Sequence, residues 1–329
     1  MKATLTLDSG QVFEGISVGG QIAGPIRDIV FNTSMTGVTE LLTDPSSMGQ
    51  ALVLTYPLIG NCGVSYQDFQ SEKPQVAALI VSELSETDSN FRSEDSLKAV
   101  LERFGIPVIT GIDTRSLVRL LRDGKSPRTV SVSVGGNGPA SRPLSSPRYQ
   151  GARKSLKAEG AAVAVPDTGL RNDLARALVS RGVSLEIFPY GEEIGGTYDG
   201  YLLPGGPGDP AEYDLTVVRH ILQTGKPILA TGLGHQLLAL ANGGTTVPLP
   251  YGHRGANIPV RDLATGKVAV TDQNHGYAVD PDSVDKASIS HVNVNDGTVE
   301  GLRRREDVLS VQFRPDKEII GEFVEILKR

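Results

Sequence analysis

The sequence predicts an α/β protein of two domains, the second built on a mostly parallel sheet. Its 329 residues are enough for two domains of about 150 residues each. Strand-like and helix-like runs alternate on short connections through residues 161–329, which is typical of parallel strands covered by helices. In residues 131–160, Gly, Ser, Pro and basic side chains replace the apolar pattern.

Residues 131–160 are interpreted as the linker between the domains. The alternative is a long functional loop inside one domain, and long connections without secondary structure are uncommon within compact domains. The predicted domains are therefore residues 1–130 and 161–329.

Residues 1–130 begin as β structure and continue with helices. KATLTL and QVFEGISV near the start are strand-like, and VAALIVSEL at 76–84 is an apolar run of strand length. Between Ser93 as N-cap and Gly105 as stop, apolar residues recur with helical spacing. A second helix is expected after IPVIT, with Asp113 as its cap.

The second domain alternates strands and helices in order. The expected strands cover 161–169, 183–189, 198–204 and 227–232. The expected helices cover 170–181, 214–223, 235–241 and the closing amphipathic segment through 319–327. In such a sheet, ligands are expected at the C-terminal ends of the parallel strands.

Composition excludes several classes of protein. With 32 Lys and Arg against 38 Asp and Glu, the net charge of −6 disfavours nucleic-acid binding by bulk charge. The single cysteine, Cys62, rules out an internal disulfide and a C-x-x-C motif. There is neither a signal-peptide pattern nor a run near the ~18 apolar residues of a membrane span. We expect a soluble, cytoplasmic protein without a nucleic-acid or membrane partner.

The most specific local pattern is PILATGLGHQLLALA at 227–241, an apolar strand that turns sharply into an apolar helix. This layout is typical of a nucleophile elbow, in which the residue at the turn carries the nucleophile and the next N–H helps to form an oxyanion hole. Gly232 occupies the tip and has no side chain. An ordinary tight turn is the alternative interpretation.

A second pattern is the Gly- and Pro-rich loop LPGGPGDP at 203–210. Its backbone N–H groups are suited to cradle an oxyanion or a carboxylate, and a plain turn is an equal alternative. No Lys-Ser or Lys-Thr follows, so the loop is not a Walker phosphate loop.

The five histidines lack the spacing of a helical zinc site, and no metal is expected. His235 follows the turn at the start of an apolar helix and is interpreted as structural rather than catalytic. His275 and His291 lie in segments interpreted as polar turns, where contact roles and structural roles are both open.

Taken together, the motifs resemble those of one known family. FNTSMTGVTELLTDPSSMGQ, TYPLIGN, GIDTR, LPGGPGDP, GLGHQLLALA, QNHGYAVD and HVNVNDGTVEGL are similar to segments of the small, glutamine-hydrolysing chain of carbamoyl-phosphate synthetase, in family order over roughly 250 residues. The resemblance implies a small-chain domain followed by a class I glutamine amidotransferase domain. It also implies glutamine hydrolysis without a cofactor, and ammonia delivery to a separate ATP-using large chain.

The three positions that the resemblance assigns to the catalytic triad are changed. The family's cysteine falls on Gly232, and its catalytic His and Glu fall on Arg314 and Asp316. Cys62 is not a substitute, because it lies in the other domain at a position that the family fills without cysteine. Thr231 is one step from the tip and has no base. The loop after Asp316 and the connection between the domains are also shortened relative to the family.

Other family positions are retained. By resemblance, the residues that would bind the substrate glutamine, including the oxyanion-hole backbone, are Ser46, Gly206, Gly208, Leu233, Gln236, Asn274, Gly276 and Tyr277.

The sequence therefore favours a pseudo-glutaminase that acts through binding or assembly. Its expected partner is itself, as a homo-oligomer or polymer, or a carbamoyl-phosphate synthetase large chain that uses free ammonia. The alternative is a working glutamine-hydrolysing subunit with a rewired active site.

Overall fold

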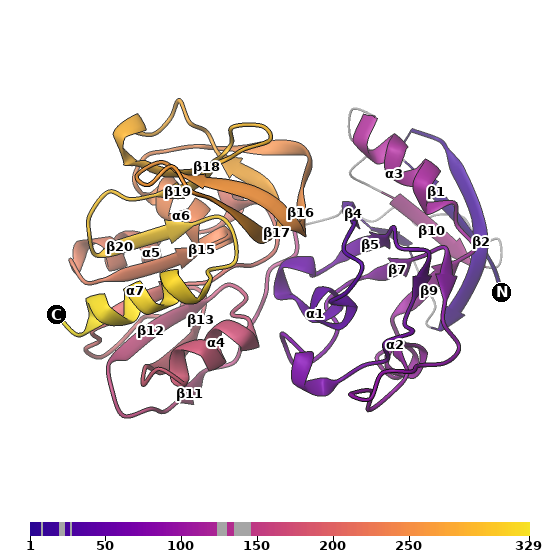
Figure 1. Cartoon of the computed structure of the whole chain (residues 1–329), viewed down its shortest axis with the longest axis horizontal. Helices are drawn as coiled ribbons and strands as arrows, with labels where there is room; N and C mark the ends of the chain where they lie inside the picture. Colours follow the sequence, from indigo (N-terminus) through magenta and orange to yellow (C-terminus); the bar gives the residue numbers. More distant parts are fainter. Residues whose placement is uncertain (8, 20–23, 27, 124–129, 135–145) are drawn as a thin grey trace. The chain divides into compact units, whose positions relative to one another are not determined.

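The computed structural model describes residues 1–7, 9–19, 24–26, 28–123, 130–134 and 146–329. These residues form two compact units, Met1–Pro147 and Arg148–Arg329 (Figure 1). Each unit has its own sheet and its own hydrophobic core. No helix in the described ranges is long and apolar enough to span a membrane.

The first unit is built on a main sheet of strand order β3-β10-β1-β2-β9-β7-β5-β4 and a small β6-β8 pair. Its strands are β1 (Lys2–Leu7), β2 (Val12–Gly19), β3 (Gly24–Ile26), β4 (Asp28–Asn32), β5 (Gln50–Leu54), β6 (Leu58–Ile59), β7 (Ala78–Ile80), β8 (Glu83–Leu84), β9 (Pro107–Thr110) and β10 (Val130–Val134). Its helices are α1 (Val38–Thr43), α2 (Leu97–Arg103) and α3 (Thr114–Asp123), with the 3-10 turns η1 (Pro45–Ser47) and η2 (Tyr66–Asp68).

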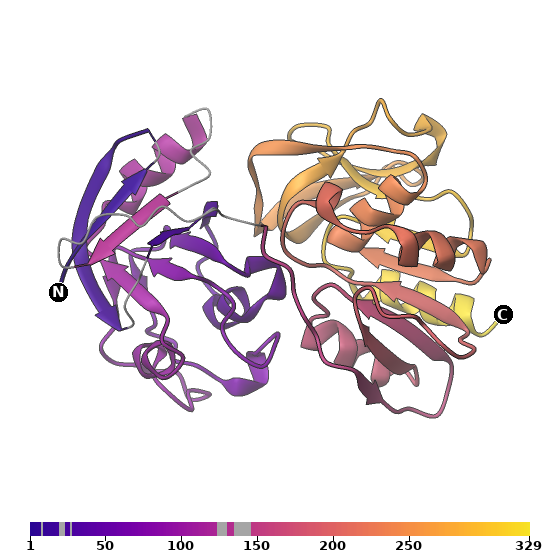
Figure 2. The same ribbon diagram turned by 180° about the vertical axis from the view of Figure 1, so that it is seen from behind.

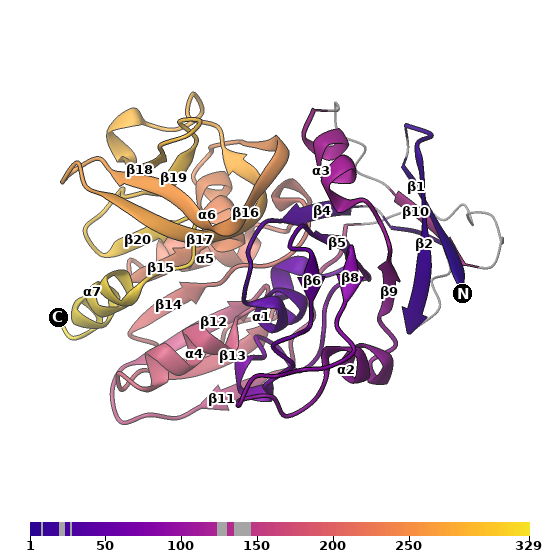
Figure 3. The same cartoon turned by 45° about the vertical axis from the view of Figure 1, so that its right-hand side comes forward.

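The main sheet of the first unit is antiparallel on one side of β9 and parallel on the other. β1 pairs antiparallel with β2 and β10, and β2 with β9, whereas β9, β7, β5 and β4 run parallel. Successive side chains of a strand face opposite sides of a sheet. Ile109 accordingly belongs to the core cluster that packs against α3 on one face of the sheet. Val108 belongs to the cluster that packs against α1 and α2 on the other face (Figure 3).

The helix predicted over 93–105 is shorter than expected. It begins at Leu97, and the hydroxyl of Ser96 caps it by accepting from the N–H of Ala99 (3.2 Å). Ser93, the predicted cap, instead donates to a backbone carbonyl outside the helix. Two serines three residues apart carry the same capping chemistry, so the pattern alone does not choose between them.

The strand predicted over 76–84 is wrong in its length. β7 ends at Ile80, and β8 then pairs with β6 outside the main sheet. The N–H of Val81 still bonds to the carbonyl of Ile109 (2.9 Å). The apolar run reflects complete burial of residues 78–81 rather than one continuous strand, since Glu83 is exposed and Leu84 is half-buried.

The predicted linker 131–160 contains strand residues at both ends. β10 pairs antiparallel with β1 and β3 in the first unit, and β11 (Lys154–Leu156) pairs antiparallel with β13 (Ser184–Pro189) in the second. Residues 135–145 lie outside the described residues. The segment VSVSV alternates β-branched and small polar residues, a strand pattern that its Gly- and Pro-rich neighbours obscure.

The second unit has one mixed sheet of order β11-β13-β12-β14-β15-β20-β19-β17-β16-β18. Its remaining strands are β12 (Ala162–Asp167), β14 (Gly200–Leu203), β15 (Ile228–Thr231), β16 (Thr246–Asp262), β17 (Val268–Val279), β18 (Ile289–Asn293), β19 (Val299–Leu302) and β20 (Val308–Val311). Its helices are α4 (Asn172–Val179), α5 (Thr216–Gln223), α6 (Leu233–Ala241) and α7 (Lys317–Leu327), with the 3-10 turns η3 (Pro210–Glu212) and η4 (Lys286–Ser288).

The expected parallel sheet is confirmed for β13, β12, β14, β15 and β20. α4 and α7 pack on one face of it, and α5 and α6 pack on the other (Figures 1 and 2). The C-terminal ends of the parallel strands β12, β14, β15 and β20 therefore lie at one edge of the sheet. The sequence predicts the candidate site at this edge.

The antiparallel half of this sheet was not expected. β16 and β17 form a long hairpin, so His275 lies within a strand, and His291 lies within β18. Their interpretation as polar-turn residues is wrong. Strands that keep one half-exposed face carry many polar residues, and the segments QNHGYAVD and HVNVNDG therefore look like turns.

Candidate functional site

Gly232 lies at the sharp turn between β15 and α6. Its φ of 53° and ψ of −116° suit glycine and strain any other residue. Its N–H donates to the carbonyl of Val311 (3.0 Å), which ties the turn to the end of β20. A Cβ at this position would lie 3.3 Å from Cα of Gly205. The predicted strand-to-helix turn beside the GGPGDP loop is confirmed.

The loop after β14 packs directly against the start of α6. A Cβ on Gly206 would overlap the carbonyl of Thr168 and lie 2.9 Å from the side chain of Leu233, so only glycine fits there. The hydroxyl of Thr168 donates to the carbonyls of Pro204 and Gly205 (both 3.0 Å) and holds the loop in place. Gly206 and Leu233, the two predicted oxyanion-hole positions, are thus neighbours.

This corner offers backbone donors for a negatively charged or carbonyl oxygen. The N–H of Leu233, the first residue of α6, has no partner inside its own helix, as for every first helical residue. The N-terminus of the helix also carries a partial positive charge. Gly208 lies further along the same loop with a φ of 88°. The arrangement can bind an oxygen atom, but Gly232 contributes no side chain to react with it.

Arg314 follows β20 and forms an ion pair with Asp272 of β17, one residue before the QNHGYAV segment. The Arg314 N–H also donates to the Asp272 carbonyl (3.0 Å). The side chains are 21% and 35% exposed, so the pair is only partly buried. The two residues are 42 positions apart, and no sequence motif links them.

Asp316, the carboxylate nearest to Arg314 in sequence, caps a helix instead of pairing with Arg314. It is the N-cap of α7, and its side chain accepts from the N–H groups of Glu318 and Ile319 (both 2.9 Å). The counter-charge of Arg314 is therefore Asp272 and not Asp316. Asp-Lys-Glu before an apolar helix is an N-cap pattern, and this signal was available.

Some of the predicted substrate-binding residues lie together in the second unit. The amide of Gln236 donates to the carbonyl of Tyr277 (2.7 Å) and to the side-chain oxygen of Gln312 (2.9 Å), which joins α6, β17 and the end of β20. Asn274 and Gly276 are in β17 with Tyr277. Ser46 belongs to the first unit, in η1, where its N–H donates to Asp44 (2.9 Å).

His235 is fully buried on α6, which agrees with its interpretation as a structural residue. Its Nδ1 bonds to the hydroxyl of Ser310 (2.8 Å), whereas its Nε2 has no hydrogen-bond partner in the described part of the chain. Burial lowers the pKa of this histidine to about 3, so the ring is neutral near pH 7.

Sequence spacing missed a buried polar cluster in the antiparallel half of the sheet. His253, His275 and Glu300 each present one possible ligand atom, and these atoms lie within 4.8 Å of one another. The amides of Asn293 (3.1 Å) and Gln273 (3.0 Å) already donate to the two oxygens of Glu300. Because these neighbours hydrogen-bond the carboxylate, the cluster is held together by the protein itself, and we assign it a structural role.

The fold and this corner define a class of protein. The glutamine amidotransferase class-I model matches residues 164–327, and the model of the carbamoyl-phosphate synthase small chain, CPSase domain, matches residues 5–130. The molecule is thus a class I glutamine amidotransferase fold preceded by a CPSase small-chain domain.

Curated relatives extend the match to nearly the whole chain. The carbamoyl phosphate synthase small chain of Caldanaerobacter subterraneus is 39% identical over 96% of this chain and 91% of the relative, and that of Fusobacterium nucleatum is 40% identical over 95% and 92%. The chain belongs to the carbamoyl-phosphate synthase small chain family. A solved glutamine amidotransferase from Thermotoga maritima is 18% identical with a TM-score of 0.40, covering 52% of this chain and 83% of that one.

Proposed function

We propose that this chain is a catalytically degenerate small-chain homologue, a pseudo-glutaminase that acts through binding or assembly. The observation that carries the proposal is the glycine at the tip of the elbow, the position at which a nucleophile elbow presents its reactive side chain. The resemblance assigns the family's catalytic cysteine to this position. Glycine has no side-chain atom that can attack the carbonyl of glutamine.

The positions assigned to the catalytic His and Glu support the same conclusion. A guanidinium stays protonated near neutral pH and therefore cannot act as a base. Arg314 is also engaged by Asp272, and Asp316 caps α7. Neither residue is suited to activate a nucleophile or to orient a base.

The neighbouring groups do not replace the lost residues. His235 lies three positions beyond the tip, but it is fully buried and, with its pKa lowered to about 3, is a very weak base. Thr231 is buried at the end of β15. A hydroxyl needs an adjacent base before it can attack.

What remains is a site built for binding. We propose that it keeps the ability to hold a carbonyl or carboxylate group without hydrolysis. In this proposal the oxygen meets the backbone of Gly206 and Leu233, and the contact positions within the second unit are Gly206, Gly208, Leu233, Gln236, Asn274, Gly276 and Tyr277.

Alkylation by a reactive glutamine analogue tests the proposal. A glutamine analogue with a diazoketone in place of its amide alkylates a working nucleophile, and intact-mass measurement detects the adduct. Cys62→Ser removes the exposed thiol of the first unit and with it the background reaction. We expect no adduct in this variant. One equivalent of adduct in the second unit would show a rewired glutaminase and would overturn the proposal.

The proposal also requires a partner, which is either a second copy of the chain or a carbamoyl-phosphate synthase large chain. A net charge of −6 on 329 residues gives too little self-repulsion to prevent close packing of copies. Sedimentation at micromolar concentration tests this part. A single species near 34.9 kDa that is unchanged by added large chain would contradict both forms of assembly.

A further inference from the structure

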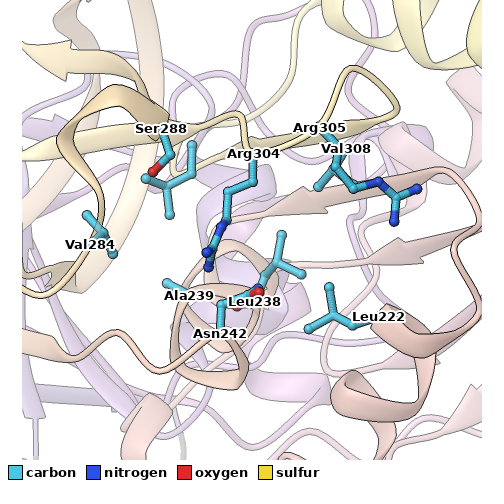
Figure 4. Close-up of a pocket in the computed structure, with 10 residues that line it drawn as sticks. Leu222, Leu238, Ala239, Asn242, Val284, Ser288, Arg304, Arg305 and Val308 are labelled. Carbon is cyan, nitrogen blue, oxygen red and sulfur yellow. Dashed lines mark hydrogen bonds between the residues drawn. The ribbon is translucent and has the colours of Figure 1, made fainter.

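A cavity of about 210 Å³ lies in the second unit, at the end of α6 opposite to the elbow (Figure 4). The cavity-lining residue of α6 nearest to the elbow is Leu238, six residues or about 9 Å of helix from Gly232. β20 also spans the distance between the cavity and the elbow. Val308 at its start lines the cavity, and the carbonyl of Val311 at its end accepts from the N–H of Gly232. The cavity is therefore distinct from the candidate site.

The walls of the cavity are mainly aliphatic. They come from α5, α6, β19, β20 and the segment around η4, and the apolar lining residues are Leu222, Leu238, Ala239, Val284, Leu302 and Val308. The polar lining groups on the walls are already engaged: Asn242 donates to the carbonyl of Leu238 (2.8 Å), and Ser288 donates to the carbonyl of Asp285 (2.6 Å). The walls thus favour an apolar occupant.

One charged side chain extends over these walls. Figure 4 shows Arg304 reaching from the β19–β20 connection toward Ala239 and Asn242, whereas Arg305 points away. Arg304 stands between two other arginines, and both of those have carboxylate partners: Arg303 pairs with Glu322, and Arg305 pairs with Asp307.

The charge of Arg304 is therefore the uncompensated one of the three. Within the residues that the structure describes, no carboxylate forms an ion pair with it. A guanidinium is a planar donor that matches a carboxylate with two parallel hydrogen bonds. A carboxylate at the mouth of the cavity would supply the missing counter-charge.

We propose that this cavity is a binding site for a small monocarboxylic acid with an apolar body of about one ring. The body occupies the aliphatic walls, and the carboxylate pairs with Arg304 at the mouth. The volume fits this class, because an apolar cavity of about 150 Å³ holds benzene and the remainder admits the acid group. The proposal is independent of the proposed function, since it uses no residue of the elbow and requires neither hydrolysis nor its absence.

Titration of the full chain with benzoate tests the proposal, with benzyl alcohol as a neutral probe of similar shape. The methyl resonances of Ala239 and Val308 report occupancy of the cavity. We expect saturable shifts with a Kd of about 1 mM, and binding of benzyl alcohol about two- to fivefold weaker, as for loss of an exposed ion pair.

Three variants separate the parts of the site. Arg304→Gln, an exchange of an exposed residue, weakens benzoate binding about two- to fivefold and leaves benzyl alcohol binding unchanged. Arg305→Gln is the matched control and changes either affinity by less than about twofold. Val284→Phe fills the cavity and weakens both probes. Shifts that do not saturate, equal affinities for the two probes, or equal losses in the two arginine variants would overturn the proposal.

Discussion

At the scale of single residues, the backbone of Gly232 allows a direct stability test. Its φ of 53° with ψ of −116° disfavours any side chain, and an added Cβ would lie 3.3 Å from Gly205. Gly232→Cys should lower the free energy of unfolding by about 1–3 kcal/mol in urea denaturation. Gly225→Cys is the control, because Gly225 has φ +67 in open space and should lose only about 1 kcal/mol. An increase in stability for Gly232→Cys would contradict the strained turn.

The Arg314–Asp272 pair defines a second residue-scale test. Because the side chains are 21% and 35% exposed, solvent screens the pair and full burial costs do not apply. Arg314→Ala should lower the free energy of unfolding by about 1 kcal/mol, less than the 3–5 kcal/mol of a broken buried pair. Arg303→Ala breaks the more exposed pair with Glu322 and should lower the free energy of unfolding by only a few tenths of a kcal/mol, about 0.3. Equal losses in the two variants would contradict the partial burial of Arg314.

The raised pKa of His253 leads us to expect that the stability of the chain depends on pH. Burial acts to lower its pKa, but the carboxylates of Glu300 and Asp296 outweigh burial and raise it above the usual value of about 6.5. A raised folded-state pKa stabilises the fold fully below pH ~6.5, and this contribution is lost as the pH rises through the folded pKa.

The test compares urea denaturation of the wild type and His253→Gln across this pH range. The stability difference between the two should be largest at acidic pH and should shrink as the pH rises. The variant comparison is needed because burial lowers the pKa values of His235, His275 and His291, whose contributions have the opposite sign. His220→Gln, on the exposed side of α5, controls for loss of an imidazole. A difference that grows with pH would contradict the assignment.

At the scale of elements, the position of α6 depends on the close packing of its first turn against β14. A Cβ on Gly234 would overlap the carbonyl of Leu203, which is backbone and cannot rotate away. Gly234→Ala should therefore lower the free energy of unfolding by about 1–3 kcal/mol, although alanine is the better helix former. Gly321→Ala in α7 is the matched control, since nothing lies within 4 Å of that position. It should stabilise the chain by up to about 1 kcal/mol, and a similar gain at Gly234 would contradict the close packing.

The elements differ in how far the sequence predicts them. The turn at Gly232 is predictable because an apolar strand, a glycine turn and an apolar helix follow one another within 15 residues. The β16–β17 hairpin is not, since its residues alternate between a covered and a half-exposed face and look like polar loops. The contacts of Arg314 with Asp272 and of His253 with Glu300 depend on strand pairing across about 40 residues, which local patterns do not contain.

At the scale of the whole molecule, the two-domain α/β fold follows from length and alternation, and family membership follows from motif order. The family relationship does not by itself decide activity, because chemistry depends on the residues at the site rather than on the fold. In this chain residues 164–327 match the class I amidotransferase model, whereas the elbow carries glycine, and arginine holds the position assigned to the base. We propose that the fold persists in this chain without glutamine hydrolysis.

The most direct test is the rate of ammonia release from glutamine by the unmodified chain, alone and with a carbamoyl-phosphate synthase large chain. We expect the rate of a protein-free control in both cases. Gly232→Cys should also stay at this level, because Arg314 offers the new thiol no base. A glutamine-dependent rate that rises in proportion to the concentration of the unmodified chain would contradict the account.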